Sequence, residues 1–181
     1  MVVLSPERAK PEKTDAEQAV RLDEATVWRW LDEVKDPEVP VISVVELGIV
    51  RGVGVDRSGL VTIDVTPTYS GCPATVIIEE LISAAIDSRG HPVYINRVIS
   101  PAWTTDWISE SGRAKLNDYG IAPPNRSGEG KASLLGIDPK LNCPRCKSTN
   151  TERISEFGST ACKALYRCKE CLEPFEYFKC I

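Results

Sequence analysis

The sequence has little histidine and no long apolar run, and these absences exclude several classes of protein. His91 is the single histidine in 181 residues, so the two Glu-x-x-His motifs of a di-iron carboxylate oxygenase cannot form. No Gly-x-Ser-x-Gly motif marks a hydrolase nucleophile, and Gly52-Val53-Gly54 lacks the third glycine of a dinucleotide-binding fingerprint. No segment approaches the ~20 apolar residues of a membrane-spanning helix. These absences argue against oxygenase, hydrolase, dinucleotide-dependent and membrane-spanning proteins.

The charge balance and the cysteine count indicate a cellular compartment. Lys and Arg number 22 against 26 Asp and Glu, a net charge of −4, which argues against a nucleic-acid partner. The first seven residues lack the basic end and apolar core of a secretory signal. Seven cysteines are an odd number, and most have metal-ligand spacing, which favours a reducing environment over a disulfide framework. We therefore expect a cytoplasmic protein that binds neither nucleic acid nor membrane.

Two C-x-x-C pairs near the C-terminus, Cys143-Pro144-Arg145-Cys146 and Cys168-Lys169-Glu170-Cys171, predict a metal site. Four thiolates with this spacing are typical of a structural zinc ribbon. Residues 142–181 are too few to bury a self-sufficient core. Metal binding, worth about 10–16 kcal/mol in small zinc modules, would replace that core. Because the same sulfurs also suit iron or an iron–sulfur cluster, these remain the alternative.

Composition divides the chain into four regions. Residues 1–21 are polar and rich in Lys, Glu and Pro, which predicts a mobile tail. Residues 22–120 carry the helix and strand patterns of a first domain. Residues 121–142 contain Pro and Gly clusters and predict a linker, which as a flexible chain would span about 25 Å. The ribbon at 143–181 could therefore swing unless it docks.

Hydrophobic periodicity in the first domain predicts an α+β fold. Val27, Trp30, Leu31 and Val34 recur at helical spacing, and Val61, Ile63 and Val65 alternate as in a half-buried strand. The expected elements are, in order, a helix that ends before Asp36-Pro37, strands at 49–55 and 60–66 joined by a turn at 56–59, a helix that starts at Pro73 and stops at Gly90, a strand at 93–99, and a helix from near Thr105 or Asp106 to Gly120. The interpretation is a small three-stranded sheet with helices on one face, followed by the zinc-ribbon-like module.

Cys72 is the strongest candidate for a reactive group outside the ribbon. It ends a strand-to-helix loop, where unpaired backbone N–H groups and the helix dipole favour a thiolate. It could be a nucleophile or a soft-metal ligand, although a small buried residue fits equally well. Asp36 and Glu38 lie in the break after the first helix, where turn formation is the default role. Cys162 and Cys180 remain as packing beside the metal, or as reserve ligands for a cluster.

Three motifs resemble the small α+β domain of SufT-type iron–sulfur maturation proteins. They are Asp36-Pro37-Glu38-Val39-Pro40, Ser43-Val44-Val45-Glu46-Leu47-Gly48-Ile49-Val50 and Thr66-Pro67-Thr68-Tyr69-Ser70-Gly71-Cys72-Pro73. In that family the aspartate of the first motif and the cysteine of the loop are the presumed functional groups. The resemblance carries these roles to Asp36 and Cys72.

Two further segments, residues 100–107 and 157–164, extend the resemblance. With them, the whole chain beyond the tail resembles the D subunits (PaaD/PaaJ type) of bacterial phenylacetyl-CoA ring-1,2-epoxidase systems. That resemblance implies aerobic phenylacetate degradation, with the di-iron centre on one separate subunit and a flavin and iron–sulfur reductase on another. The single histidine agrees with an accessory role for this chain.

Three hypotheses follow from the resemblance. The leading one is a maturation factor for the oxygenase iron centre or the reductase cluster, in which Cys72 and Asp36 hold a labile metal and the ribbon docks a partner. The second is a structural or regulatory subunit that uses an apolar patch near Trp103 and Trp107. The third, an enzyme with Cys72 as nucleophile, lacks a placed histidine base. Partners would be the oxygenase or reductase subunits, with a homodimer left open.

Overall fold

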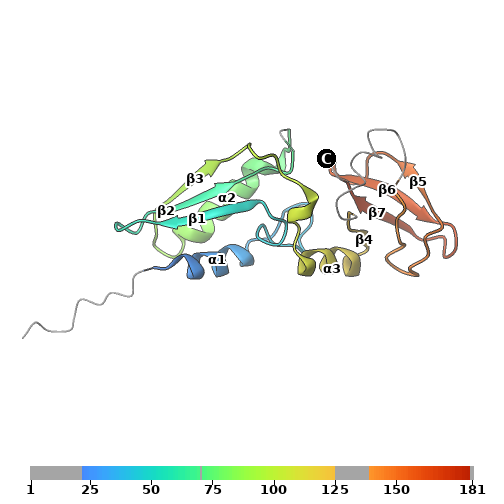
Figure 1. Ribbon diagram of the computed structural model, residues 1–181, viewed down its shortest axis with the longest axis horizontal. Helices are drawn as coiled ribbons and strands as arrows, with labels where there is room; N and C mark the ends of the chain where they lie inside the picture. Colours follow the sequence, from blue (N-terminus) through green and yellow to red (C-terminus); the bar gives the residue numbers. More distant parts are fainter. Residues whose placement is uncertain (1–21, 70, 125–138, 180–181) are drawn as a thin grey trace, which may run out of the picture.

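Two β-sheets, one in each half of the chain, organise the computed structural model (Figure 1). The structure describes residues 22–69, 71–124 and 139–179. The expected tail at 1–21 and most of the expected linker, residues 125–138, lie outside the described residues. Within the described residues no helix has the length and apolar character that would let it cross a bilayer.

The first half begins with the predicted helix and hairpin. Helix α1, Glu24–Glu33, starts after Asp23, whose Oδ1 accepts the N–H of Thr26 at 2.8 Å, an ordinary N-cap. Strands β1, Val50–Val55, and β2, Val61–Val65, pair antiparallel. In the turn between them Asp56 accepts the N–H groups of Ser58 and Leu60. The helix and the hairpin are therefore where the sequence placed them.

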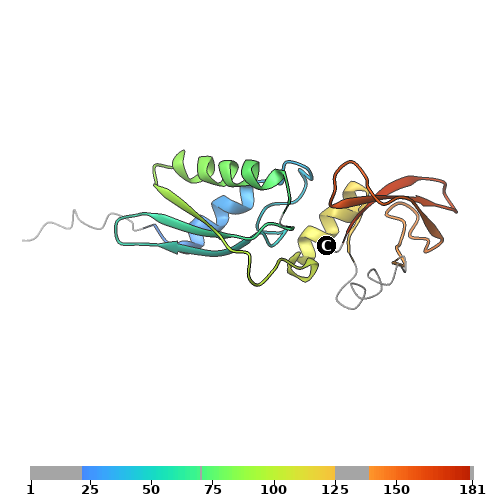
Figure 2. The ribbon, with the colours of Figure 1, turned by 90° about the horizontal axis from the view of Figure 1, so that it is seen from above.

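A helix and a third strand complete this half. Helix α2, Ala74–Asp87, leads to β3, Val93–Arg97, which pairs parallel with β2. The alternating residues of β2 are at most 1% exposed, because they face the core under the helices. Figure 2 shows α1 and α2 on the same side of this sheet, whose strand order is β1-β2-β3. The predicted α+β class, with helices on one face of a three-stranded sheet, is confirmed for the described residues.

The last helix of the first half starts later than predicted. Thr105–Trp107 form only a short 3₁₀ turn, and helix α3 spans Glu110–Tyr119. Ser109 is the cap, because its Oγ accepts the N–H of Gly112 at 3.0 Å. The end of the helix is as predicted, since Gly120 stands at φ +94° as the left-handed C-cap.

The second sheet begins inside the region expected to be a linker. Ile121–Ala122 form β4 and pair parallel with β7, Pro174–Phe178. The sheet continues with β6, Lys163–Cys168, and β5, Thr151–Ser155, in the order β4-β7-β6-β5. The expectation of a linker from residue 121 is therefore wrong at its first two residues, because buried backbone there finds its hydrogen bonds on the ribbon.

The ribbon docks on the first half through two of its own side chains. Cys162 and Phe178 belong to the apolar cluster of the first half, separate from the ribbon's own core. The ring of Phe178 lies 6.2 Å from that of Trp103, and Trp103 Nε1 donates to the carbonyl of Leu47 at 3.0 Å. Trp103 is 5% exposed, so the expected partner-binding patch at this residue is wrong: the chain itself covers it.

The loop between α1 and β1 is fixed by a close approach and by an ion pair in which the carboxylate is buried and the lysine is exposed. Gly48 stands at φ +73°, and a Cβ there would lie 2.6 Å from the carbonyl oxygen of Trp107. Glu46 accepts hydrogen bonds from Lys115 Nζ at 2.6 Å and from the N–H of Ser43 at 3.1 Å. Burial opposes ionisation, but these bonds prevail and lower the pKa of Glu46. The loop thereby holds Asp36 and Glu38 in fixed positions at its start.

Candidate functional site

The four cysteines of the C-x-x-C pairs meet at one point of the ribbon. Cys143, Cys146, Cys168 and Cys171 place their sulfurs within 4.8 Å of one another. Across the two pairs, the Cys146 and Cys168 sulfurs are 3.4 Å apart, and those of Cys143 and Cys171 are 3.7 Å apart. Sulfur separations of this size fit four thiolates at about 2.3 Å from one tetrahedral ion. The four sulfurs are therefore placed so that they could hold one metal ion.

Each pair occupies a turn of the same construction. The residue after the second cysteine has a left-handed backbone in both turns, Lys147 at φ 63° and Leu172 at φ 62°. The first cysteine of each pair donates its N–H to a carbonyl beyond the turn, Cys143 to Ser148 at 2.9 Å and Cys168 to Glu173 at 3.0 Å. The backbone therefore closes around each pair and points both sulfurs inward.

The environment of this cluster shifts the pKa values of its thiols in opposite directions. Although the backbone N–H of Glu173 opposes the shift, desolvation and the neighbouring sulfurs raise the pKa of the Cys171 thiol to about 12. Cys143 and Cys168 are fully buried, whereas Cys146 and Cys171 are exposed. A hydrogen bond from the backbone N–H of Cys171 lowers the pKa of the Cys168 thiol to about 7. Next to the cluster, the ring of Tyr166 lies 5.9 Å from that of Phe175 and 5.8 Å from that of Tyr177. The ribbon therefore has only a small aromatic core, with the four sulfurs next to it, in place of the apolar interior of a larger domain.

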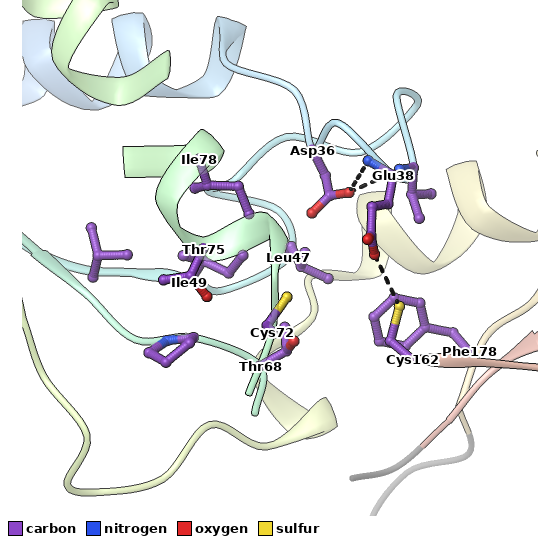
Figure 3. A pocket seen from close by; sticks show the side chains of 13 residues that line it. Asp36, Glu38, Leu47, Ile49, Thr68, Cys72, Thr75, Ile78, Cys162 and Phe178 are labelled. Carbon is purple, nitrogen blue, oxygen red and sulfur yellow. Dashed lines mark hydrogen bonds between the residues drawn. The ribbon is translucent and has the colours of Figure 1, made fainter. Parts of the chain in front are cut away.

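A second group of chemical side chains lines a pocket between the two halves (Figure 3). Asp36, Glu38 and Cys72 come from the first half, and Cys162 and Phe178 from the ribbon. About 20 Å³ of the pocket is open to the centres of water molecules, little more than one water requires. The pocket therefore has room for an ion or a water molecule and excludes an organic cofactor or a CoA thioester.

The two carboxylates of the Asp36-Pro37-Glu38 turn have different surroundings. Asp36 Oδ1 accepts the N–H groups of Glu38 and Val39, both at 2.8 Å. Burial raises the pKa of Asp36. Glu38 instead extends across the domain boundary, where its Oε2 accepts the thiol proton of Cys162 at 3.6 Å. Asp36 thus shapes the turn, and Glu38 presents its carboxylate to the ribbon.

Cys72 lies where the sequence placed it, at the entry to α2. Its N–H donates to the carbonyl of Tyr69 at 3.2 Å, and its own carbonyl accepts from Thr75 at 3.2 Å. The helix begins after Pro73 with no side chain capping it, so the positive end of its dipole lies beside Cys72. Cys72 is half-buried and lines the pocket across from Cys162 (Figure 3).

Cys162 is the functional candidate that the sequence left without a role. The sequence suggested that Cys162 packs beside the four ribbon sulfurs or is a reserve ligand. Its side chain instead lies in the core of the first half. Its sulfur lies 3.0 Å from Thr160 Oγ1, and burial raises its pKa to about 11. The two C-x-x-C pairs already supply four candidate ligands, so Cys162 is a surplus cysteine. That surplus was the signal available in the sequence. Cys180 lies outside the described residues.

Lys163 is a further member of the pocket region that the sequence did not indicate. Its side chain is 4% exposed, and its ammonium lies 3.1 Å from Glu176. Its positive charge acts on Asp36 and on Cys162, lowering the pKa of both against the stronger effect of burial. A buried cation that acts on Asp36 and Cys162 and pairs with Glu176 partly offsets the negative charge of this region.

Two family models match the chain, one on each half. Residues 24–91 match the iron–sulfur cluster assembly protein family, and residues 127–179 match the PaaD zinc beta ribbon domain. A protein of Escherichia coli (strain K12), provisionally named as the D subunit of 1,2-phenylacetyl-CoA epoxidase, is 49% identical over 86% of this chain and 92% of its own length.

Two more relatives cover the first half alone. The Fe-S protein maturation auxiliary factor SufT of Staphylococcus aureus (strain USA300) is 35% identical over 46% of this chain and 96% of its own length. A crystal structure of a domain of unknown function from Bacillus anthracis is 26% identical, with a TM-score of 0.49, over 51% of this chain and 90% of that one. The two family models and the relatives from E. coli and S. aureus confirm the resemblances stated from the motifs.

Proposed function

Because the chain belongs to the family of phenylacetyl-CoA epoxidase D subunits, we propose that it is an accessory protein that supplies iron to that enzyme system. The first half supports this proposal through its similarity to iron–sulfur maturation factors. The client is either the di-iron oxygenase subunit or the iron–sulfur reductase. The chain would bind iron as cargo, hold it briefly and release it to the client by ligand exchange.

The pocket at Cys72 is the observation on which this function depends. A thiol at an uncapped helix start opens into a space of about 20 Å³ beside two carboxylates. Thiolate and carboxylate together suit iron, and a half-buried position lets a client exchange ligands with the ion. Cargo must be bound weakly enough to leave, so a site with few protein ligands serves delivery better than a closed four-cysteine site.

The ribbon cluster has the opposite character, and we assign zinc to it. Four protein thiolates close the coordination shell and leave no position for a substrate or a client ligand. Zinc has no redox chemistry and would act there by holding the ribbon folded. Iron is the competing ion for these sulfurs. Protein purified without oxygen distinguishes them, since zinc leaves it colourless and thiolate-bound iron gives visible absorption bands.

The test measures iron delivery in cells. Cells would produce the oxygenase and reductase subunits together with either the wild-type chain or Cys72→Ser, and each purified client would be analysed for iron. We expect Cys72→Ser to lower the iron content of one client while the subunits still associate. Ser88→Ala, at the other end of α2, is the control and should leave iron content unchanged.

A structural or regulatory subunit without metal chemistry would give a different pattern. Cys72→Ser would then leave the iron content of both clients at the wild-type level, and that result would refute the delivery function. Under the same alternative, replacing the ribbon cysteines would abolish association, because the ribbon would serve only to hold the assembly together.

A further inference from the structure

We propose that the ribbon completes the cargo site, so that Cys162, Cys72 and Glu38 together bind one iron(II) ion between the two halves of the chain. The proposal rests on the delivery function and adds to it two ligands, one of them from the ribbon. It also assigns to the ribbon a direct chemical part in handling the cargo, beyond docking.

The position of Cys162 supports this assignment first. Cys162 directly precedes β6, yet it packs in the core of the first half and not with Cys143 and Cys168 in the ribbon core. It is 5% exposed. The ribbon metal already has four sulfurs, so this fifth described cysteine of the second half is not needed there.

The contact with Glu38 supplies the second argument. The thiol of Cys162 points at Glu38 Oε2, 3.6 Å away, and Figure 3 shows the two side chains meeting at the boundary of the halves. Asp36 uses one carboxylate oxygen to fix the turn that carries Glu38. We therefore treat Asp36 as a positioning residue, and Glu38 as the carboxylate ligand.

The pocket connects Cys72 to this pair. Cys72 and Cys162 line the same pocket from opposite sides (Figure 3), so an ion placed between them would be in reach of a thiol from each half.

The size of the pocket and the type of its ligands define what binds. A space of about 20 Å³ accepts a single ion and is too small for an iron–sulfur cluster. Two thiolates and one carboxylate suit iron(II) and leave coordination positions open for water or for a client. Each thiol gives up its proton to solvent when the ion binds, so two protons are released for each ion taken up.

Binding must also draw the two halves together. Among the described residues, the sets of three or more potential ligands that already lie within 4.8 Å are limited to the ribbon cluster. The three proposed ligands therefore close on the ion by small side-chain and domain movements. Release of the cargo is then coupled to a slight opening of the interface at Cys162.

The experiment uses cobalt(II) as a spectroscopic probe on the full chain with zinc in the ribbon, without oxygen. Zinc binds such sites more tightly than cobalt, so cobalt reports on the second site. We expect one cobalt per chain with thiolate charge-transfer absorption. Cys72→Ser and Cys162→Ser should each remove roughly half of that absorption and weaken binding by at least about tenfold. Glu38→Gln should weaken binding and retain the absorption.

A matched carboxylate control and a variant-free measurement guard against misfolding. Glu79→Gln, at a surface ion pair with Arg97, should bind cobalt like the wild type. In the wild-type chain, cobalt should protect both Cys72 and Cys162 from iodoacetamide, as measured by peptide mass spectrometry. Protection of Cys72 alone would contradict the proposal even if Cys162→Ser failed to fold.

The outcomes separate this inference from the delivery function. If Cys162→Ser keeps wild-type absorption and affinity while Cys72→Ser loses both, the inference fails and the delivery function stands. Absence of thiolate absorption from the wild-type chain also overturns the inference. If both cysteine variants lose the absorption but Cys72→Ser cells contain fully iron-loaded clients, the composite site is real and the delivery function is wrong.

Discussion

Replacing Phe178 with alanine should loosen the ribbon from the first half and expose Cys162. Phe178 is 2% exposed and contributes its ring to the apolar cluster of the first half, 6.2 Å from the ring of Trp103. Removing a buried phenylalanine side chain costs about 3–5 kcal/mol. The low end applies here, because neighbouring side chains and water can partly fill a gap at an interface.

A loss of about 3 kcal/mol corresponds to a shift of roughly 100-fold in the docking equilibrium, at 1.4 kcal/mol per factor of ten. Alkylation of Cys162 requires the interface to open. When opening and closing are fast, the alkylation rate follows the population of the open form. We therefore expect Phe178→Ala to increase the rate of Cys162 alkylation by iodoacetamide roughly 100-fold, measured peptide by peptide in zinc-loaded protein.

Phe157→Ala provides the matched control. Phe157 is 63% exposed on the same ribbon, so its removal leaves the docked interface intact and should not change the alkylation of Cys162. A rate within about fivefold of the wild type in Phe178→Ala would show that the interface does not depend on this ring. A large acceleration in Phe157→Ala would show that general loosening of the ribbon, and not undocking, exposes the thiol.

Three further predictions test the scaffold. A strong chelator should remove about 10–16 kcal/mol of metal stabilisation from the ribbon, so the near-ultraviolet circular dichroism of its aromatic side chains should collapse while the helical signal of the first half persists. Gly48→Ala should destabilise the chain by about 2–3 kcal/mol in urea titrations, because the added Cβ would meet the backbone of Trp107. Gly54 has open space around it, so the control Gly54→Ala should change stability much less. Lys115→Met should cost about 1–2 kcal/mol at pH 7. The pKa of Glu46 is lowered in the folded chain, so this cost should disappear as the pH falls below the pKa of Glu46 in the folded chain. An equal cost at pH 7 and pH 3 would contradict the assigned ion pair.

Much of the first half could be predicted because its signals are local. The alternation of β2 and the helical spacing of α1 each follow from one buried face. The start of α3 could not be fixed in this way, because Thr104 and Ser109 are both competent caps. Which of them starts the helix depends on packing: Gly112 sits against Ile42 and the carbonyl of Glu46, and that contact is not visible in the sequence near the cap.

The ribbon cluster and the pocket at Cys72 differ in how far the sequence could define them. The ribbon cluster follows from C-x-x-C spacing, because each pair is brought together by its own turn. The pocket at Cys72 could be predicted only in part, since Cys72 and Asp36 belong to recognisable motifs but Cys162 enters from the ribbon. The position of Cys162 in the pocket depends on docking through Phe178 and on the pairing of β4 with β7. These are long-range contacts, which leave no periodic pattern in the sequence.

Under the proposed function, the construction of β6 gives a reason for joining a zinc ribbon to an iron-delivering domain. Cys162 directly precedes this strand, and Cys168, one of the four clustered cysteines, is its last residue. The strand pairs with β5 on one side and with β7 on the other. A structural metal at one end would therefore fix the thiol at the other end, where it faces Glu38 and Cys72. A thiol on a flexible tail would lose conformational entropy each time it bound cargo, and a strand anchored by zinc would lose much of that entropy when the ribbon folds.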